Sequence, residues 1–126
     1  MIKGIGVDIL SIDKLNPILQ QDNYIQDSFI RKTYTSREIE LAETRPNPIY
    51  FYATRFAGKE AVFKALNVTG EDLHLNEIEI LSTDTGKPYI VLHGMAKTLA
   101  ENAEISHVLI SLSYEDDTAI AYAVAE

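Results

Sequence analysis

The sequence contains no cysteine. Disulfide bonds, thiolate metal ligands and a cysteine nucleophile are therefore excluded. No segment approaches the roughly 18 consecutive apolar residues of a membrane span. The N-terminus, Met1-Ile2-Lys3-Gly4, runs straight into a strand-like segment, whereas a secretory signal needs a longer apolar stretch after its positive start. We therefore expect a cytoplasmic protein without membrane contacts.

Basic residues are also scarce, with 11 Lys and Arg against 19 Asp and Glu and a net charge of −8. This balance argues against general nucleic-acid binding. The bases are unevenly placed, because residues 31–64 hold seven bases against four acids and so carry a charge of +3. Such a basic island suggests a local site for a phosphate-bearing anion. A solvated helix face is the alternative explanation.

The length and patterning predict one domain over residues 1–126. Gly4-x-Gly6 lacks the third glycine and the following helix of a dinucleotide-binding fingerprint. Helices grouped before a mostly antiparallel set of strands indicate an α+β domain. The predicted strands are 2–10, 77–81, 88–92, 108–113 and 118–124, and the predicted helices are 11–19, 22–32, 36–44, 49–66 and 95–102.

The helix predicted over 49–66 carries the most informative polar residues. Glu60 and Lys64 are four apart and share a face, with Lys59 and Arg55 near its edge. A surface Glu–Lys pair would be the ordinary explanation. The helix also carries a large apolar stripe, which would place these polar residues at the boundary of the core. There an acid and several bases suit a site for a metal and a polyanion.

Asp8 is the second candidate, because an acid near the end of an apolar strand is costly to bury unless it is paired or binds metal. Capping of the following helix is the alternative. Asp8 and Glu60 together would offer Mg²⁺ two carboxylates, and water and substrate phosphates would complete its coordination. The three histidines show no metal-binding spacing and are expected at the surface or at strand ends: His74, His93 and His107.

Five short motifs, in order and at suitable spacing, resemble those of the holo-acyl-carrier-protein synthases, the small phosphopantetheinyl transferases. The resemblance runs nearly from end to end. The motifs are Gly4-Ile5-Gly6-Val7-Asp8-Ile9, Tyr34-Thr35-Ser36-Arg37-Glu38, Phe56-Ala57-x-Lys59-Glu60-Ala61-x-x-Lys64-Ala65, Gly86-Lys87-Pro88 and Ser111-Leu112-Ser113.

The resemblance implies an α+β subunit, a mostly antiparallel sheet packed with a long central helix, and a homotrimer with active sites between subunits. It also implies that a serine of apo acyl carrier protein attacks the β-phosphate of coenzyme A, giving holo carrier and 3′,5′-ADP for fatty acid biosynthesis. Asp8 and Glu60 would hold Mg²⁺, and Lys64 would lie by the phosphates. The adenosine and the remaining anion site would be contacted by Gly86, Lys87, Pro88, Arg55 and Lys59.

Several positions depart from the family pattern, and two of them bear on function. Tyr114 stands where the family usually has histidine, and a tyrosine with a pKa of about 10 is a poor base near neutral pH. Lys14 replaces the arginine with which members of the family usually bind the acidic carrier protein. Two alternatives therefore stay open, a coenzyme A-binding relative with weak or no transfer and a purely structural oligomerisation domain.

Overall fold

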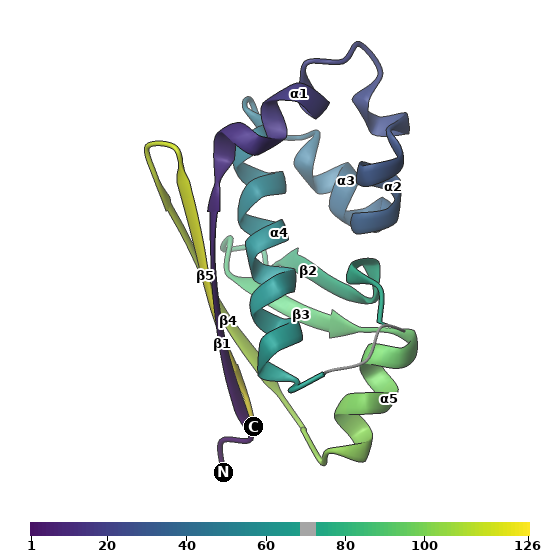
Figure 1. Cartoon of the computed structure of the whole chain (residues 1–126), viewed down its shortest axis with the longest axis vertical. Coiled ribbons are helices and arrows are strands. Elements are labelled where there is room, and N and C mark those ends of the chain that lie inside the picture. The colour runs from purple at the N-terminus through teal and green to yellow at the C-terminus, as the bar shows by residue number, and fades with distance from the viewer. Residues whose placement is uncertain (69–72) are drawn as a thin grey trace.

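A long central helix lies between two antiparallel sheets in the computed structural model, which describes residues 1–68 and 73–126 (Figure 1). This helix is α4 (Pro48–Ala65). Pro48 begins it, as expected for a residue that has no N–H and is favoured in the first turn. One side of α4 packs on β1, β5 and β4, and β2 of the second sheet also contacts it.

The larger sheet has the order β1-β5-β4, with all pairs antiparallel. Its strands are β1 (Gly4–Ser11), β4 (Val108–Glu115) and β5 (Thr118–Ala125). β1 and β5 are the first and last strands of the chain, so their pairing brings the two termini together (Figure 1). Because β1 is an edge strand, one side of it remains free for side chains of α4.

Small residues let α4 approach the sheet closely. A Cβ atom added to Gly6 would lie 1.9 Å from the carbonyl oxygen of Ala61, and one added to Gly4 would lie 1.9 Å from that of Ala65. The strand and helix backbones are therefore in direct contact at these two glycines. The β5 side chains on this inner face are all alanines: Ala119, Ala121, Ala123 and Ala125.

The opposite side of this sheet, which we call the outer face, is exposed and mostly apolar. The strand registers align three residues of each strand in a three-by-three array. Ile9 is 68% exposed and Ile5 is 58% exposed, which is unusual for isoleucine. The outer face consists of Ile5, Val7, Ile9, Ile120, Tyr122, Val124, Leu109, Ser111 and Ser113.

The second sheet pairs β2 (Ile78–Ser82) with β3 (Pro88–Leu92) and is followed by α5 (Gly94–Asn102). A short 3₁₀ turn, η3 (Leu75–Glu77), precedes β2. The Glu77 carboxylate accepts a 3.0 Å hydrogen bond from the backbone N–H of Ala96. An acid from outside α5 thus satisfies one of its free N-terminal donors.

Short helices cover the N-terminal end of α4. The predicted helix 11–19 divides at Pro17 into η1 (Ile12–Leu15) and α1 (Asn16–Leu19), because proline is tolerated only in a first turn. The predicted helix 22–32 becomes η2 (Tyr24–Gln26) and α2 (Ser28–Thr33). The capping box at Thr35 and Glu38 is present and begins α3 (Ser36–Ala42).

The predicted α+β class is confirmed, but the prediction of an apolar stripe on α4 is wrong. α4 is buried on most of its circumference, since elements pack on several sides, and even Arg55 and Lys59 lie in the interior. Residues 69–72, in the loop expected between α4 and β2, lie outside the described residues. Among residues 1–68 and 73–126, no helix has the length and apolar character needed to cross a bilayer.

Candidate active site

Asp8, Glu60 and Lys64 come together where the free edge of β1 meets α4. The Lys64 ammonium lies 3.4 Å from an Asp8 carboxylate oxygen and donates a 2.9 Å hydrogen bond to the backbone carbonyl of Val7. Asp8 shares the inner side of β1 with Gly6, so it faces α4. The predicted surface pair is not formed, because no ion pair joins Glu60 to Lys64 among the residues that the structure describes.

The two carboxylates repel one another in this partly buried setting. Burial raises the pKa of Glu60 above its ordinary value, the negative charge of Asp8 raises it further, and Lys64 offsets part of the rise. Asp8 does not cap a helix, since it lies inside β1 and the N-cap position of η1 is Ser11. A bound cation would relieve the repulsion that the fold imposes on these acids.

The donor set fits a magnesium ion. Within residues 1–68 and 73–126 there is no group of three or more His, Cys, Asp or Glu side chains that could hold a metal. Asp8 and Glu60 therefore offer two carboxylates and no nitrogen or sulfur ligand. Mg²⁺ commonly takes one or two carboxylates and completes its octahedron with water and substrate phosphates.

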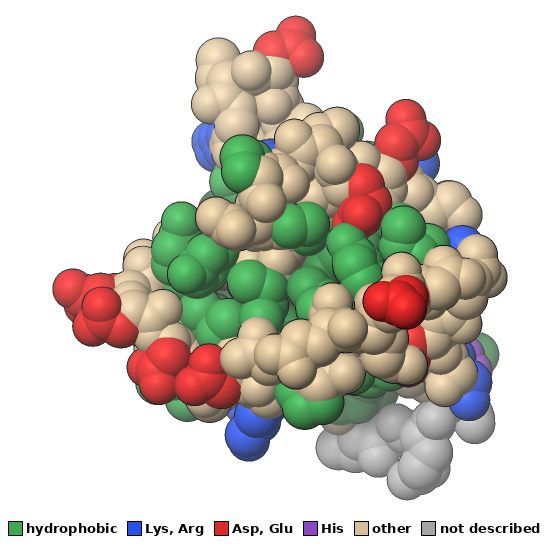
Figure 2. Space-filling model, turned by 90° about the horizontal axis from the view of Figure 1, so that it is seen from above, with side chains coloured by type: hydrophobic (Ala, Val, Ile, Leu, Met, Phe, Trp, Pro, Cys, Tyr) green, Lys and Arg blue, Asp and Glu red, His purple; other side chains and the backbone are tan. Residues whose placement is uncertain are grey.

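Lys59 does not join this cluster, although the sequence grouped it with the anion site. Its side chain is 0% exposed, and its ammonium donates to the Glu38 carboxylate and to two backbone carbonyls. The basic island of residues 31–64 is therefore not a continuous basic surface, because Arg55 is also buried. Seen from the end where α1 lies, acidic side chains surround a central apolar area (Figure 2).

Arg55 lies in a second site with the chemistry of an anion pocket. A hollow of about 290 Å³ is lined by Arg45, Asn47, Arg55 and Tyr114, among others. The Arg55 guanidinium lies 4.0 Å from the centre of the Phe51 ring, and its buried Nε has no hydrogen-bond partner among residues 1–68 and 73–126. Burial, and next the charge of Arg45, lower the pKa of Arg55 to about 10. Two arginines held this close favour a bound anion.

Local sequence patterns did not single out Arg45 or Tyr50 as site residues. Arg45 belonged to the basic island, but nothing in its local pattern distinguished it from a surface arginine. Tyr114 stacks on Tyr50, with ring centres 4.7 Å apart and an angle of 22° between the rings. The position at which the chain departs from the family pattern therefore forms one wall of the arginine pocket.

Gly86 and Lys87 lie in the exposed turn between β2 and β3, and Pro88 begins β3. Thr83 accepts hydrogen bonds from the backbone N–H groups of Gly86 and Lys87, and Gly86 has φ +88°, which favours glycine. Arg55 donates a 2.8 Å hydrogen bond to Ser82, directly before this turn. No hydrogen bond or ion pair among the described residues links the turn to the Asp8 cluster.

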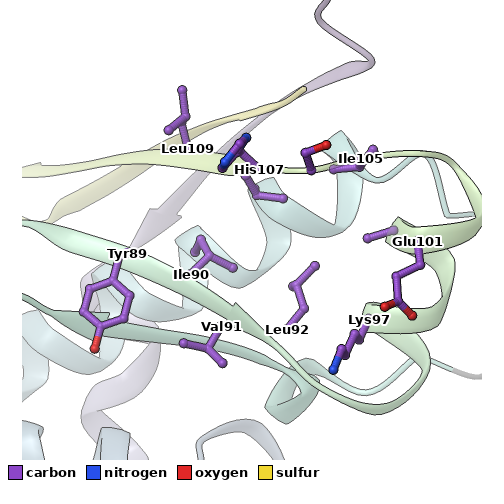
Figure 3. Close-up of a pocket in the computed structure, with 12 residues that line it drawn as sticks. Tyr89, Ile90, Val91, Leu92, Lys97, Glu101, Ile105, His107 and Leu109 are labelled. Carbon is purple, nitrogen blue, oxygen red and sulfur yellow. The ribbon is translucent and has the colours of Figure 1, made fainter.

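A groove of about 630 Å³ lies elsewhere, between β3, α5 and β4. Figure 3 shows Ile90, Val91 and Leu92 of β3 beside it, with Lys97 and Glu101 on α5 and His107 near β4. None of the predicted site residues lines this groove, and its walls are mainly apolar. The chemistry therefore centres on the Asp8 cluster and the arginine pocket.

Comparisons with known proteins identify the family of the chain. A holo-[acyl-carrier-protein] synthase of Alkaliphilus oremlandii is 40% identical over 125 residues, which cover 99% of both chains. The crystal structure of the Neisseria meningitidis holo-[acyl-carrier-protein] synthase matches with a TM-score of 0.84 and 31% identity, covering 100% of this chain and 99% of that one. The Helicobacter pylori enzyme, solved in complex with coenzyme A, matches with a TM-score of 0.79 and 28% identity, covering 97% of this chain and 99% of that one. Residues 4–123 match the family model of the 4′-phosphopantetheinyl transferase superfamily, and the chain belongs to that superfamily.

Proposed function

We propose that the chain is a Mg²⁺-dependent holo-acyl-carrier-protein synthase, which moves 4′-phosphopantetheine from coenzyme A to a serine of an apo acyl carrier protein. The observation that carries this proposal is the cluster of Asp8, Glu60 and Lys64 at the free edge of β1. Family membership and full-length similarity to enzymes of that name support it. Fatty acid biosynthesis is the process that such a carrier would serve.

In the proposed reaction, the serine oxygen of the carrier forms a bond to the β-phosphorus of coenzyme A. The bond from that phosphorus to the bridging oxygen breaks, 3′,5′-ADP leaves with the electron pair, and the serine proton passes to solvent water. Lys64, held beside Asp8 and the Val7 carbonyl, would neutralise charge on the phosphates. Mg²⁺ held by Asp8 and Glu60 would polarise the phosphoryl oxygens. Positioning and charge neutralisation provide most of the catalysis in such transfers.

The arginine pocket suits the remaining anionic group of coenzyme A, its 3′-phosphate. Arg45 and Arg55 both line the pocket, and each guanidinium is a planar group of donors suited to a phosphate. Arg55 keeps the role in anion binding that the sequence suggested. The buried ammonium of Lys59 has three protein acceptors, so we do not assign it to coenzyme A.

We further propose a homotrimer, with each active site completed by a neighbouring subunit. The outer face is a contiguous apolar array on one side of a sheet, a surface typical of an interface. Gly86, Lys87 and Pro88 would then contact the adenosine bound at a neighbouring subunit.

Size-exclusion chromatography with light scattering tests the proposed trimer. Ile120→Lys on the outer face should give monomers that lack transfer, whereas Thr98→Lys on the exposed side of α5 should remain trimeric. Monomeric wild-type protein with full activity would contradict the proposal.

A coenzyme A-binding relative with weak or no transfer is the second candidate. The stacked Tyr50–Tyr114 pair favours it, because these rings occupy the wall of the arginine pocket where the family usually provides an imidazole. The predicted cytoplasmic location remains a prediction.

Intact-mass spectrometry of an apo acyl carrier protein, incubated with this protein, coenzyme A and Mg²⁺, separates the two candidates. A gain of one phosphopantetheine that is lost with EDTA is the expected result. Binding of coenzyme A without any gain on several carriers would favour the second candidate.

A further inference from the structure

The ammonium of Lys59 is fully used inside the protein. Its three hydrogens match three acceptors: Glu38 Oε1 at 2.7 Å, the Ile78 carbonyl at 2.6 Å and the Leu75 carbonyl at 3.1 Å. Both Lys59 and Glu38 are 0% exposed. A buried charge pair is a costly choice for stability alone, since apolar residues of similar size often do as well. This cost suggests that the pair has another role.

Glu38 joins the elements around Lys59. One carboxylate oxygen also accepts from the N–H of Thr35, and the other accepts from the N–H of Ile80 at 2.8 Å. The buried pair therefore connects α4 to the start of α3, to β2 and to the segment before β2. On this side of α4, α3, η3 and β2 are all hydrogen-bonded to Lys59.

The opposite side of the same helical turn is fixed as well. The Ala61 carbonyl lies against Gly6 of β1, where no side chain fits between them. Each helical residue advances about 100° around the axis. Glu60 therefore lies about 100° from Lys59 in one direction and about 100° from Ala61 in the other. Two fixed neighbours thus determine where the Glu60 carboxylate points.

We infer that Lys59 is a positioning residue whose buried ammonium fixes the rotation of α4 and so directs Glu60 toward Asp8. This inference rests on the proposed function, because it assigns Glu60 to the metal. It gives Lys59 a part in the reaction without any contact with coenzyme A. The Gly4–Ala65 and Gly6–Ala61 contacts hold the helix against β1, and the buried pair is a polar link that fixes it on the side of α3 and β2.

The test uses the double variant Lys59→Met, Glu38→Gln, which removes both buried charges, and circular dichroism verifies that it is folded. Mn²⁺ binding in the presence of coenzyme A is followed by the electron paramagnetic resonance signal of free Mn²⁺, and Mg²⁺ dependence by the transfer rate. We expect the Mn²⁺ dissociation constant and the half-saturating Mg²⁺ concentration to rise about tenfold or more, as when the support of a metal ligand is lost. Glu77→Ala, which loosens only the start of α5, is the control and should lower the melting temperature without changing Mn²⁺ affinity.

A chemical rescue tests the same point in a second way. The chain has no cysteine, so Lys59→Cys introduces a single thiol that can be aminoethylated in denaturant to regenerate a buried ammonium. Refolded aminoethyl protein should regain Mn²⁺ affinity, and an uncharged alkyl group of the same length should not. The inference is overturned if the double variant binds Mn²⁺ within about twofold of the parent, or if rescue restores stability but not Mn²⁺ affinity. Failure of the parent protein itself to bind Mn²⁺ would instead contradict the proposed function.

Discussion

Lys59 and Glu60 are consecutive residues of one helix, yet their surroundings are opposite. Lys59 is fully buried, and all its donors are paired with protein acceptors. Glu60 is partly exposed, and its partial burial, followed by the charge of Asp8, raises its pKa. Its cationic neighbour, Lys64, is 51% exposed. Adjacent positions of one helix can therefore serve different roles. Lys59 is paired with Glu38 inside the protein, whereas Glu60 lies near Asp8 at a site open to ligands.

The Lys59–Glu38 pair contributes to the structure, and the cluster of Asp8, Glu60 and Lys64 is available to ligands. A buried ion pair with all hydrogen bonds made is rigid, and removing one partner leaves an unpaired charge. Glu60 forms no ion pair among the described residues and lies near the charge of Asp8, an unfavourable arrangement that a bound metal ion would relieve. Functional sites are where such unfavourable arrangements are retained.

Loss of either carboxylate should have the largest effect. We expect Asp8→Ala and Glu60→Ala to lower the transfer rate by about a thousandfold or more, because the site would keep a single metal ligand. Circular dichroism should show that both variants stay folded. Glu40→Ala, at an exposed acid of α3, is the control. Transfer at the wild-type rate by either variant would remove the metal assignment.

The two lysines should separate stability from catalysis. Lys59→Met leaves the Glu38 charge buried and unpaired, so we expect a loss of about 3–5 kcal/mol in the free energy of unfolding. Lys64→Met changes an exposed side chain and should alter that free energy by about 0.5 kcal/mol at most, while transfer slows about a hundredfold. Urea denaturation and initial rates measure the two quantities. Equal losses of stability in the two variants would contradict the assignment of Lys59 to the structure and Lys64 to the site.

Arg55 is a buried cation like Lys59, but it lines the arginine pocket. We expect Arg55→Met to weaken binding of coenzyme A by about ten- to a hundredfold, the size of one charge-assisted phosphate contact. Calorimetry should show no such loss with 3′-dephospho-coenzyme A, which lacks the phosphate assigned to this pocket. The same loss with both ligands would place the 3′-phosphate elsewhere.

The smallest predicted effect concerns the stability of the metal-free protein. The pKa of Glu60 is raised above 4.5, so ionisation of Glu60 opposes folding, and this cost is full only above the folded-state pKa. Glu60→Gln should therefore stabilise the metal-free protein at pH 7 by about 0.5 kcal/mol. The gain should vanish as the pH falls below 4.5. Melting temperatures of both proteins, measured with EDTA from pH 7 to below 4.5, test this prediction. A lower melting temperature of the variant at pH 7 would contradict it.

Sequence patterns predicted the α+β class, the capping box at Thr35 and Glu38, and most strand positions. These features depend on local periodicity and on hydrogen bonds between residues close in the chain. The helix predicted over 11–19 failed at its proline, and the apolar stripe on α4 failed because several elements surround the helix. Local patterns do not report how many sides of a helix will be covered.

The kinds of side chain at the site could be predicted from the sequence, because the order of its motifs resembles the family pattern and places Asp8, Glu60 and Lys64 at matching positions. Which of the charged groups are buried and paired depends on the packed fold. Lys59 and Arg55 read alike as bases beside an acid, but one has every donor satisfied and the other retains an unpaired nitrogen. That difference arises from residues distant in sequence, Glu38 and Ile78 for Lys59 and Phe51 and Ser82 for Arg55. Burial and partners are properties of the packed chain, so they follow from the fold and not from local spacing.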